Sequence, residues 1–192
     1  KKVCELAQGW LIENGLKNPN GGWCLFVSFL RPHYPLTCPS EFYDLYNSID
    51  LPNPLKKADL PELEHPVLKN LKKSCDYDKS FADETRQIAI KSYYGLCTFV
   101  DDMVGKINKT LNETSLDKTT NILFTSDHGE CLGDRGFWTK MVMFEEASAI
   151  PLIMFGPDIS SGICKAPVSL IDIYPTVLDL LSIKKPNNLP IH

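Results

Sequence analysis

The chain lacks any long apolar run. No stretch approaches the roughly 20 consecutive apolar residues that a membrane-spanning helix needs, and Lys1-Lys2 leads into no apolar signal-peptide core. The sequence therefore predicts no membrane association. It also lacks an initiating methionine, so we expect the natural protein to extend further toward its N-terminus and any targeting signal to lie there. The compartment stays open.

The sequence also lacks a basic cluster and a regular cysteine pattern. Its formal net charge is -4, which argues against a nucleic-acid partner, because surfaces that follow nucleic acid gather Lys and Arg against the phosphates. Seven cysteines are present, but none forms a Cys-x-x-Cys pair or the spacing of a zinc site or disulfide framework. We interpret most of them as small buried hydrophobic residues.

What is present is a globular composition. The 192 residues have 43% hydrophobic content, which is sufficient for one ordinary core. No repeat, low-complexity tract or long block of like charges divides the chain. We therefore expect one domain, or part of one.

Short apolar runs predict three strands. The first runs from Trp23 to Leu30 between Asn20-Gly21-Gly22 and Arg31-Pro32, and its nearly continuous apolar character indicates a buried strand. Asn121 to Phe124 and Ile150 to Phe155 are the other two.

Two segments have helical spacing. Apolar residues from Glu84 to Leu111 recur at three- and four-residue steps, which predicts a long amphipathic helix. Ser169 to Leu181 has the same spacing after Pro167. Between Leu51 and Ser80, four prolines interrupt a charged stretch, which indicates a surface excursion, either a lid or a plain insertion. Strands that alternate with helices predict an α/β fold.

An acid and an imidazole follow the second predicted strand directly. Asp127 and His128 therefore emerge at the edge of a sheet, where ligands commonly bind, and are candidate metal ligands. The alternative is a hydrogen-bonded turn, because Asp readily bonds its own backbone.

The wider context resembles a known family. The string from Ile122 to Pro151 is similar to the second metal-binding segment of the sulfatase family, within the alkaline-phosphatase superfamily. It contains a strand, DHGE, LGDRG, a lysine, FEE and IPLI. Other blocks occur in the family's order: Phe26-Val27-Ser28-Phe29, Arg31-Pro32-His33-Tyr34-Pro35, Tyr93-Tyr94-Gly95 through Asp101-Asp102, and Ser169 to Thr176. The choline-sulfatase branch is the most similar.

The resemblance implies a fold and its limits. We expect an α/β, alkaline-phosphatase-like sandwich, with helices flanking a central mixed sheet that is incomplete at both ends. Residues 1–192 would form part of one sulfatase catalytic domain that lacks the N-terminal nucleophile segment.

The resemblance also implies roles for four residues. Asp127 and His128 would hold a divalent cation, with calcium favoured and manganese or magnesium as alternatives. Many sulfatases have Asn where His128 stands. Lys140 and His33 would contact the sulfate group as catalytic residues. Without the family, Lys140 is also compatible with a solvated surface lysine and His33 with a strand cap.

Two apparent matches are set aside. Asp101-Asp102 resembles the paired aspartates of the family's first metal strand, but the helical spacing places them on a helix. Cys131 and Arg135 have the spacing of the nucleophile motif Cys-x-Pro-x-Arg, but Gly133 replaces Pro or Ala. Ala149 stands where related sequences usually have Arg. We therefore assign no nucleophile within the chain and expect a formylglycine upstream of it, so that the 192 residues alone are inactive.

Three functions compete. The first is a sulfuric ester hydrolase that acts on a small sulfate ester. The second is a phosphodiesterase or phosphonate monoester hydrolase of the same superfamily, and the third is a non-catalytic binding remnant. Tyr34, Phe137 and Trp138 either surround a quaternary ammonium or simply pack. The oligomeric state stays open.

Overall fold

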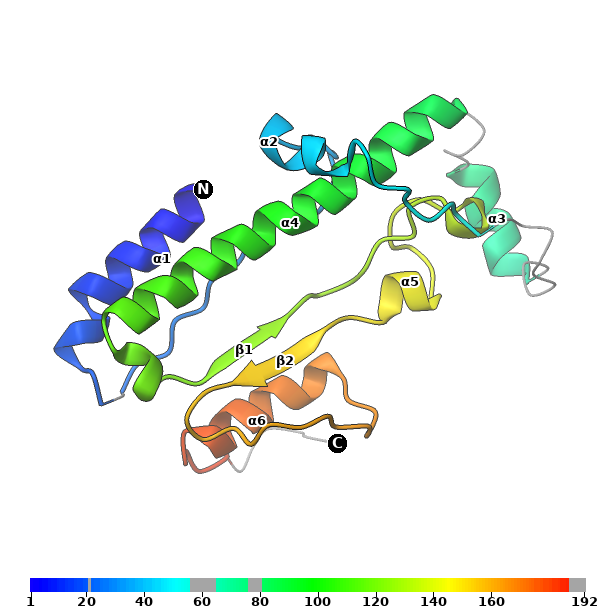
Figure 1. Ribbon diagram of the computed structural model, residues 1–192. Helices are drawn as coiled ribbons and strands as arrows, with labels where there is room; N and C mark the ends of the chain where they lie inside the picture. The colour runs from blue at the N-terminus through cyan, green and yellow to red at the C-terminus, as the bar shows by residue number, and fades with distance from the viewer. Residues whose placement is uncertain (21, 56–64, 76–80, 187–192) are drawn as a thin grey trace.

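The computed structural model describes residues 1–20, 22–55, 65–75 and 81–186. In chain order its helices and strands are α1 (Lys2–Glu13), α2 (Ser40–Tyr43), α3 (Pro66–Ser74), α4 (Asp83–Glu113), β1 (Ile122–Thr125), α5 (Glu145–Ser148), β2 (Leu152–Phe155) and α6 (Ile173–Leu180), with short 3-10 turns between several of them. One long helix, α4, runs along the molecule; α1 and α2 lie beside it, and the two strands lie between α4 and α6 (Figure 1).

The long helix α4 confirms the predicted amphipathic stripe. Asp83 and Glu84 occupy its first turn, where acidic side chains complement the helix dipole. One face is buried, and α1 packs along it through Cys4, Ala7 and Leu11. These three residues have a helical three- and four-residue spacing, which is the signal in the sequence that could have predicted α1.

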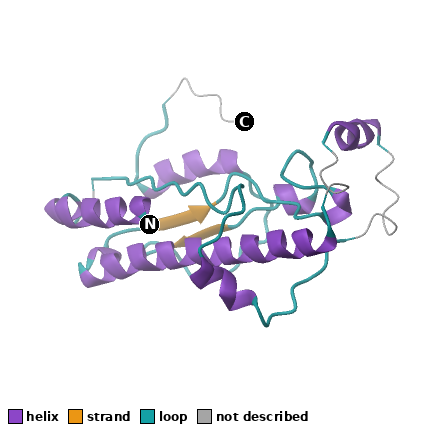
Figure 2. Cartoon of the chain, turned by 90° about the horizontal axis from the view of Figure 1, so that it is seen from above, coloured by secondary structure: helices purple, strands orange, loops and turns teal. Residues whose placement is uncertain are grey.

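The two later strands form a small antiparallel sheet. β1 pairs with β2, with Ile122 opposite Phe155 and Thr125 opposite Leu152. The helices α1 and α4 lie on one side of this pair and α6 on the other (Figure 1). Seen from above, the strands run along the length of α4 (Figure 2). Both predicted strands and the predicted helix after Pro167 are therefore confirmed, and the sheet within the described residues has two strands.

The prediction of a buried strand from Trp23 to Leu30 is wrong for the described residues. The segment is extended, but it has no sheet partner there, and its side chains alternate between exposed and half-buried. Phe26 is 89% exposed and Leu30 is 75% exposed. A strand is buried only when other elements cover both of its faces. The described part of the chain covers only one face of residues 23–30.

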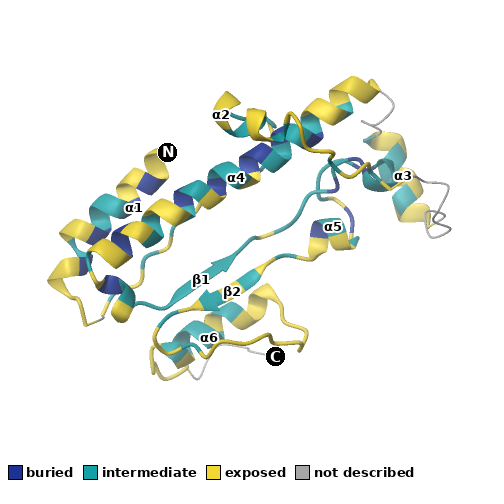
Figure 3. Ribbon diagram, in the orientation of Figure 1, coloured by how far each residue is buried: buried dark blue, intermediate teal, exposed yellow. Residues whose placement is uncertain are grey.

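Two separate apolar clusters stabilise the molecule, one near each end of β1 (Figure 3). In the first, Leu11, Leu111 and Leu116 join α1 to the end of α4. In the second, the buried members come from residues 131–147 and pack against α3: Cys131, Phe137, Val142 and Ala147 with Leu68 and Leu71.

The predicted surface excursion contains a helix. Within it, α3 begins at Pro66, and the ring of His65 caps it by accepting a hydrogen bond from the Val67 N–H at 3.3 Å. The prediction of a surface excursion did not include this helix, and residues 56–64 and 76–80 lie outside the described residues. Throughout the described ranges, no helix is long and apolar enough to cross a membrane.

Two glycines of α4 should respond oppositely to alanine. A Cβ at Gly95 would lie 2.6 Å from Cys38 Sγ and 3.1 Å from the Phe42 carbonyl oxygen, whereas one at Gly105 meets nothing within 4 Å. We expect Gly95→Ala to lower the free energy of unfolding by about 1–3 kcal/mol through overpacking. Gly105→Ala should raise it by roughly 0.5–1 kcal/mol through helix propensity. Urea unfolding midpoints measure both, and equal shifts would contradict this packing of α2 on α4.

Candidate active site

Two extended segments converge on one place. β1 leads directly into Asp127 and His128, and residues 23–30 lead into the turn that carries His33. Both segments begin beside the apolar cluster that joins α1 to α4. Both end where the rings of His33 and His128 meet edge to face, with centroids 5.7 Å apart. They therefore run in the same direction, and their ends bring together residues about 95 positions apart.

A contact between Lys140 and His33 fixes the protonation of the His33 ring. The Nδ1 of His33 lies 2.9 Å from the Tyr34 carbonyl oxygen, and its Nε2 contacts the ammonium of Lys140. A carbonyl only accepts and an ammonium only donates, so Nδ1 carries the proton and Nε2 is the acceptor. The contacts therefore assign the Nδ1–H tautomer to His33, with Nε2 facing Lys140.

Lys140 has no carboxylate partner among the described residues. Its ammonium lies 5.7 Å from the centroid of the Tyr34 ring, in addition to the His33 contact. Of its three N–H donors, the imidazole takes one. The other two remain for an anion that binds beside His33.

His128 and Asp127 present two potential ligand atoms to the same space. The Nδ1 of His128 donates to the Gly129 carbonyl oxygen at 2.8 Å, which leaves Nε2 with a free lone pair in the neutral ring. This Nε2 lies 3.7 Å from Asp127 Oδ2. Two ligands of one ion, each about 2.0–2.4 Å from it, lie roughly 3–4 Å apart. The pair therefore fits one side of a metal site.

Other ligands are needed to complete such a site. In the part of the chain that the structure describes, no group of three or more His, Cys, Asp or Glu residues is placed to hold an ion. The Asp127 side chain is 84% exposed, and its Oδ1 accepts the His128 N–H at 3.0 Å. Oδ2 of Asp127 is thus open to solvent, and an ion bound there would take its other ligands from outside the described residues.

Lys140 lies on a loop that is closed at its base. Gly129 N donates to the Ala147 carbonyl oxygen at 2.8 Å, and Cys131 N donates to the Thr139 carbonyl oxygen at 3.0 Å. A Cβ at Gly129 would overlap the Glu146 carbonyl oxygen, so only glycine allows this approach. We call residues 130–146 the lysine loop. Its closure fixes the base of the loop that carries Lys140, whose ammonium contacts His33.

An ion pair that sequence reasoning missed stabilises the lysine loop from within. Arg135 and Glu146 are 2.6 Å apart, with side chains only 16% and 21% exposed. The Arg135 guanidinium hydrogen-bonds Glu146 and holds the pKa of that carboxyl below its usual value, while partial burial opposes the shift. Arg135 also stacks over the Phe144 ring at 4.6 Å. The two residues are eleven positions apart, and no periodic pattern in the sequence connects them.

The structure thus brings together all four residues proposed from the sequence, His33, Asp127, His128 and Lys140. Their roles stay predictions. His65 caps α3 instead, and His192 lies outside the described residues.

The two matches that were set aside are not in this cluster. Asp101 and Asp102 lie on α4, where Asp102 pairs with Lys106 at 2.6 Å. Cys131 is 2% exposed, and burial raises the pKa of its thiol to about 12, with nearby Glu130 as the next cause. A protonated, buried thiol is a poor nucleophile.

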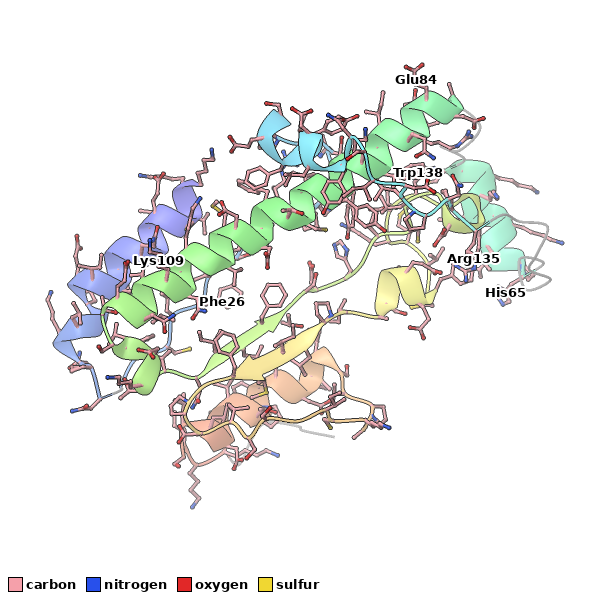
Figure 4. All side chains as sticks on the ribbon, viewed as in Figure 1. Phe26, His65, Glu84, Lys109, Arg135 and Trp138 are labelled. Carbon is pink, nitrogen blue, oxygen red and sulfur yellow. The ribbon has the colours of Figure 1, made fainter. Side chains whose placement is uncertain are left out.

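Of the three aromatic residues, only Tyr34 borders the cluster. Its ring lies against His33, with centroids 4.2 Å apart, and is half exposed. Trp138 packs edge to face on Phe81 at 5.2 Å, and Phe137 is buried against Phe144. Trp138 and Arg135 lie at the α3 end of the molecule, while Lys109 lies at the opposite end of α4 (Figure 4).

Comparison with known proteins shows the family of the chain. The sulfatase family model matches residues 1–183. A choline-sulfatase of Rhizobium meliloti is 36% identical over 162 residues, which are 84% of this chain and 32% of that protein. An arylsulfatase K of Danio rerio is 38% identical over 151 residues, which are 77% of this chain and 28% of that protein.

Solved structures give the same result for the fold. A phosphonate monoester hydrolase from Silicibacter pomeroyi superimposes with a TM-score of 0.82 at 32% identity, over 97% of this chain and 39% of that one. The chain thus spans about a third of the length of the relatives that it matches. On the family model and these identities, it belongs to the sulfatase family.

Proposed function

We propose that residues 1–192 form part of the catalytic domain of a sulfuric ester hydrolase that acts on a small sulfate ester. The observation that carries this proposal is the convergence of His33, Lys140, His128 and Asp127 from three segments of the chain. A lysine ammonium beside an imidazole and two open ligand atoms is an arrangement suited to a small tetrahedral anion.

The two catalytic residues have distinct tasks in this proposal. Lys140 donates its two remaining N–H groups to sulfate oxygens and stabilises the negative charge that grows on the leaving oxygen. His33 holds the Lys140 ammonium in place through Nε2, while its Nδ1 is engaged with the Tyr34 carbonyl oxygen. His33 therefore serves sulfate binding in this arrangement by orienting Lys140.

Asp127 and His128 would hold a divalent cation next to this pair. A bound divalent ion supplies Lewis-acid polarisation of the sulfate oxygens. The open Asp127 oxygen suits calcium, with manganese or magnesium as alternatives, because all three ions prefer oxygen ligands; the imidazole nitrogen of His128 is a softer ligand. The Nδ1–H bond from His128 to the Gly129 carbonyl is the kind of outer contact that orients a metal-bound histidine.

The nucleophile belongs to sequence outside residues 1–192 in this proposal. Cys131 does not fit the role, because it is buried and its thiol stays protonated. We propose a formylglycine upstream, as the family resemblance implies, and therefore no turnover by residues 1–192 alone.

The directions of the extended segments support a larger sheet. β1 pairs with β2 in antiparallel fashion, while residues 23–30 run in the direction of β1 without a partner among the described residues. We propose that strands from outside this chain join both segments into a central mixed sheet. Phe26, which lies between α4 and β1 in the view of Figure 4, would then be covered.

A second function has support from the fold. The phosphonate monoester hydrolase of Silicibacter pomeroyi shares 32% identity and a TM-score of 0.82 with this chain. A phosphonate monoester bound to the present protein would also present an anionic tetrahedral group to Lys140. Rates of the full protein on matched sulfate and phosphonate monoesters separate the two, and a preference for the phosphonate would overturn the sulfatase proposal.

The first prediction of this proposal concerns Lys140. We expect Lys140→Ala in the full protein to lower kcat/KM for a sulfate ester by about 10²–10³-fold, the range for loss of a charge-stabilising donor. Lys109→Ala is the matched control, because Lys109 is exposed at the far end of α4. An unchanged kcat/KM in Lys140→Ala would remove this residue from the mechanism.

The second prediction concerns the cation. We expect Asp127→Ala to weaken calcium binding by at least about tenfold, because one of two charged or basic ligand atoms is lost. Isothermal titration with calcium measures this without any substrate. Asp101→Ala, on the exposed face of α4, should bind calcium like the parent, and equal affinity in both variants would refute the assignment.

The third prediction concerns Cys131. With a thiol pKa near 12, roughly one molecule in ten thousand carries the thiolate at pH 8. Iodoacetamide should therefore leave Cys131 unmodified in the native protein and alkylate it in urea, as peptide mass spectrometry can follow. Rapid native labelling would restore Cys131 as a candidate nucleophile.

A further inference from the structure

Lys140 follows a residue with an unfavourable backbone. Thr139 has a φ of 74°, in the left-handed region that β-branched residues rarely adopt. Leu132, seven residues earlier in the lysine loop, also has a positive φ of 49°. Such conformations persist only where the surroundings hold them. The direction in which Lys140 leaves the loop therefore depends on whatever fixes Thr139.

One carboxylate oxygen binds both of these residues. Oε1 of Glu130 accepts the Thr139 N–H at 2.5 Å and the Leu132 N–H at 3.3 Å. The Thr139 carbonyl oxygen is also held, because it accepts the Cys131 N–H at 3.0 Å. Both backbone groups of Thr139 are thus tied to the two residues that follow Gly129. Hydrogen bonds to an ionised acceptor are stronger than neutral ones.

We propose that Glu130 is a positioning residue for Lys140. It acts by holding Thr139 in the left-handed conformation, and this directs the Lys140 ammonium onto His33 Nε2. The proposal rests on the proposed function, in which Lys140 contacts the sulfate. In this role Glu130 acts through Lys140, and what it supplies is a hydrogen-bond acceptor at a fixed place.

Two substitutions at Glu130 distinguish the role of its hydrogen-bond acceptor from the role of its negative charge. Glu130→Gln keeps an oxygen that accepts both amides, whereas Glu130→Ala removes it. In the full protein we expect Glu130→Ala to lower kcat by about 10²-fold, the effect of a catalytic group displaced by roughly 1 Å. Glu130→Gln should restore kcat to within about fivefold of the parent. If Glu130→Gln is as impaired as Glu130→Ala, the charge matters and the proposal is wrong.

A double-mutant cycle tests whether Glu130 acts through Lys140. In a Lys140→Ala background, Glu130→Ala should change kcat by less than about twofold, because the group that it positions is already absent. Equal losses in both backgrounds would show that Glu130 acts elsewhere. Glu113→Ala, at the exposed end of α4, is the control for a carboxylate with no such role. Glu130→Asp, one methylene shorter, replaces Glu130→Ala if the latter does not fold.

A second readout is independent of turnover. With ¹⁵N-labelled histidine in the full protein, the His33 ring signals report whether Nε2 accepts from Lys140. Lys140→Ala and Glu130→Ala should shift the Nε2 resonance alike, and Glu130→Gln should leave it in place. If the protein hydrolyses no sulfate ester, the proposed function fails while this measurement still decides the role of Glu130. An unshifted His33 signal in Glu130→Ala would overturn the positioning role.

Discussion

The close approach of Gly129 to the backbone of residues 146 and 147 is the constraint on which the candidate site depends. It joins the segment that follows β1 to α5, which precedes β2, at a distance that no Cβ atom at Gly129 would permit. The seventeen-residue lysine loop between them is therefore closed at its base before any side chain of the loop contributes. Glu130, Arg135 and Glu146 then stabilise a loop whose ends are already fixed. Without that closure, the direction of β1 would determine the position of Asp127 but not that of Lys140.

The lysine loop combines features that destabilise it with features that stabilise it. Leu132, Arg135 and Thr139 all have positive φ, and the Arg135–Glu146 pair is largely removed from water. Ion pairs of this kind contribute little net stability but destabilise strongly when one partner is lost. The second apolar cluster, with Cys131 and Phe137 at its centre, offsets these terms by packing the loop against α3. A strained loop over a packed base is what a precisely oriented lysine requires.

The local pattern of apolar residues was sufficient to predict the helices and strands that bury one face against a neighbouring element. The stripe of α4 and the short apolar runs of β1 and β2 were predicted because each is paired or packed within the described chain. The stretch from Trp23 to Leu30 was not, because apolar content alone does not say whether both faces are covered. The four candidate site residues were proposed from the order of the sequence motifs along the chain. For Asp127 and His128, their place directly after a predicted strand was a second reason. The contact of Lys140 with His33 joins residues 107 positions apart, and no spacing rule predicts such a contact. Glu130 stood within a quoted motif, but its role depends on the backbone angles of Thr139, which the sequence does not reveal.

The extended residues 23–30 have a consequence for the isolated polypeptide. They present alternate apolar side chains, Phe26 and Leu30 among them, beside backbone groups that have no ladder partner in the described part of the chain. An open, apolar strand edge of this kind is a template for other chains. Solubility of the polypeptide therefore depends on how quickly a neighbouring strand occupies that edge during folding, and a ribosome or chaperone that delays release until then would protect it from self-association.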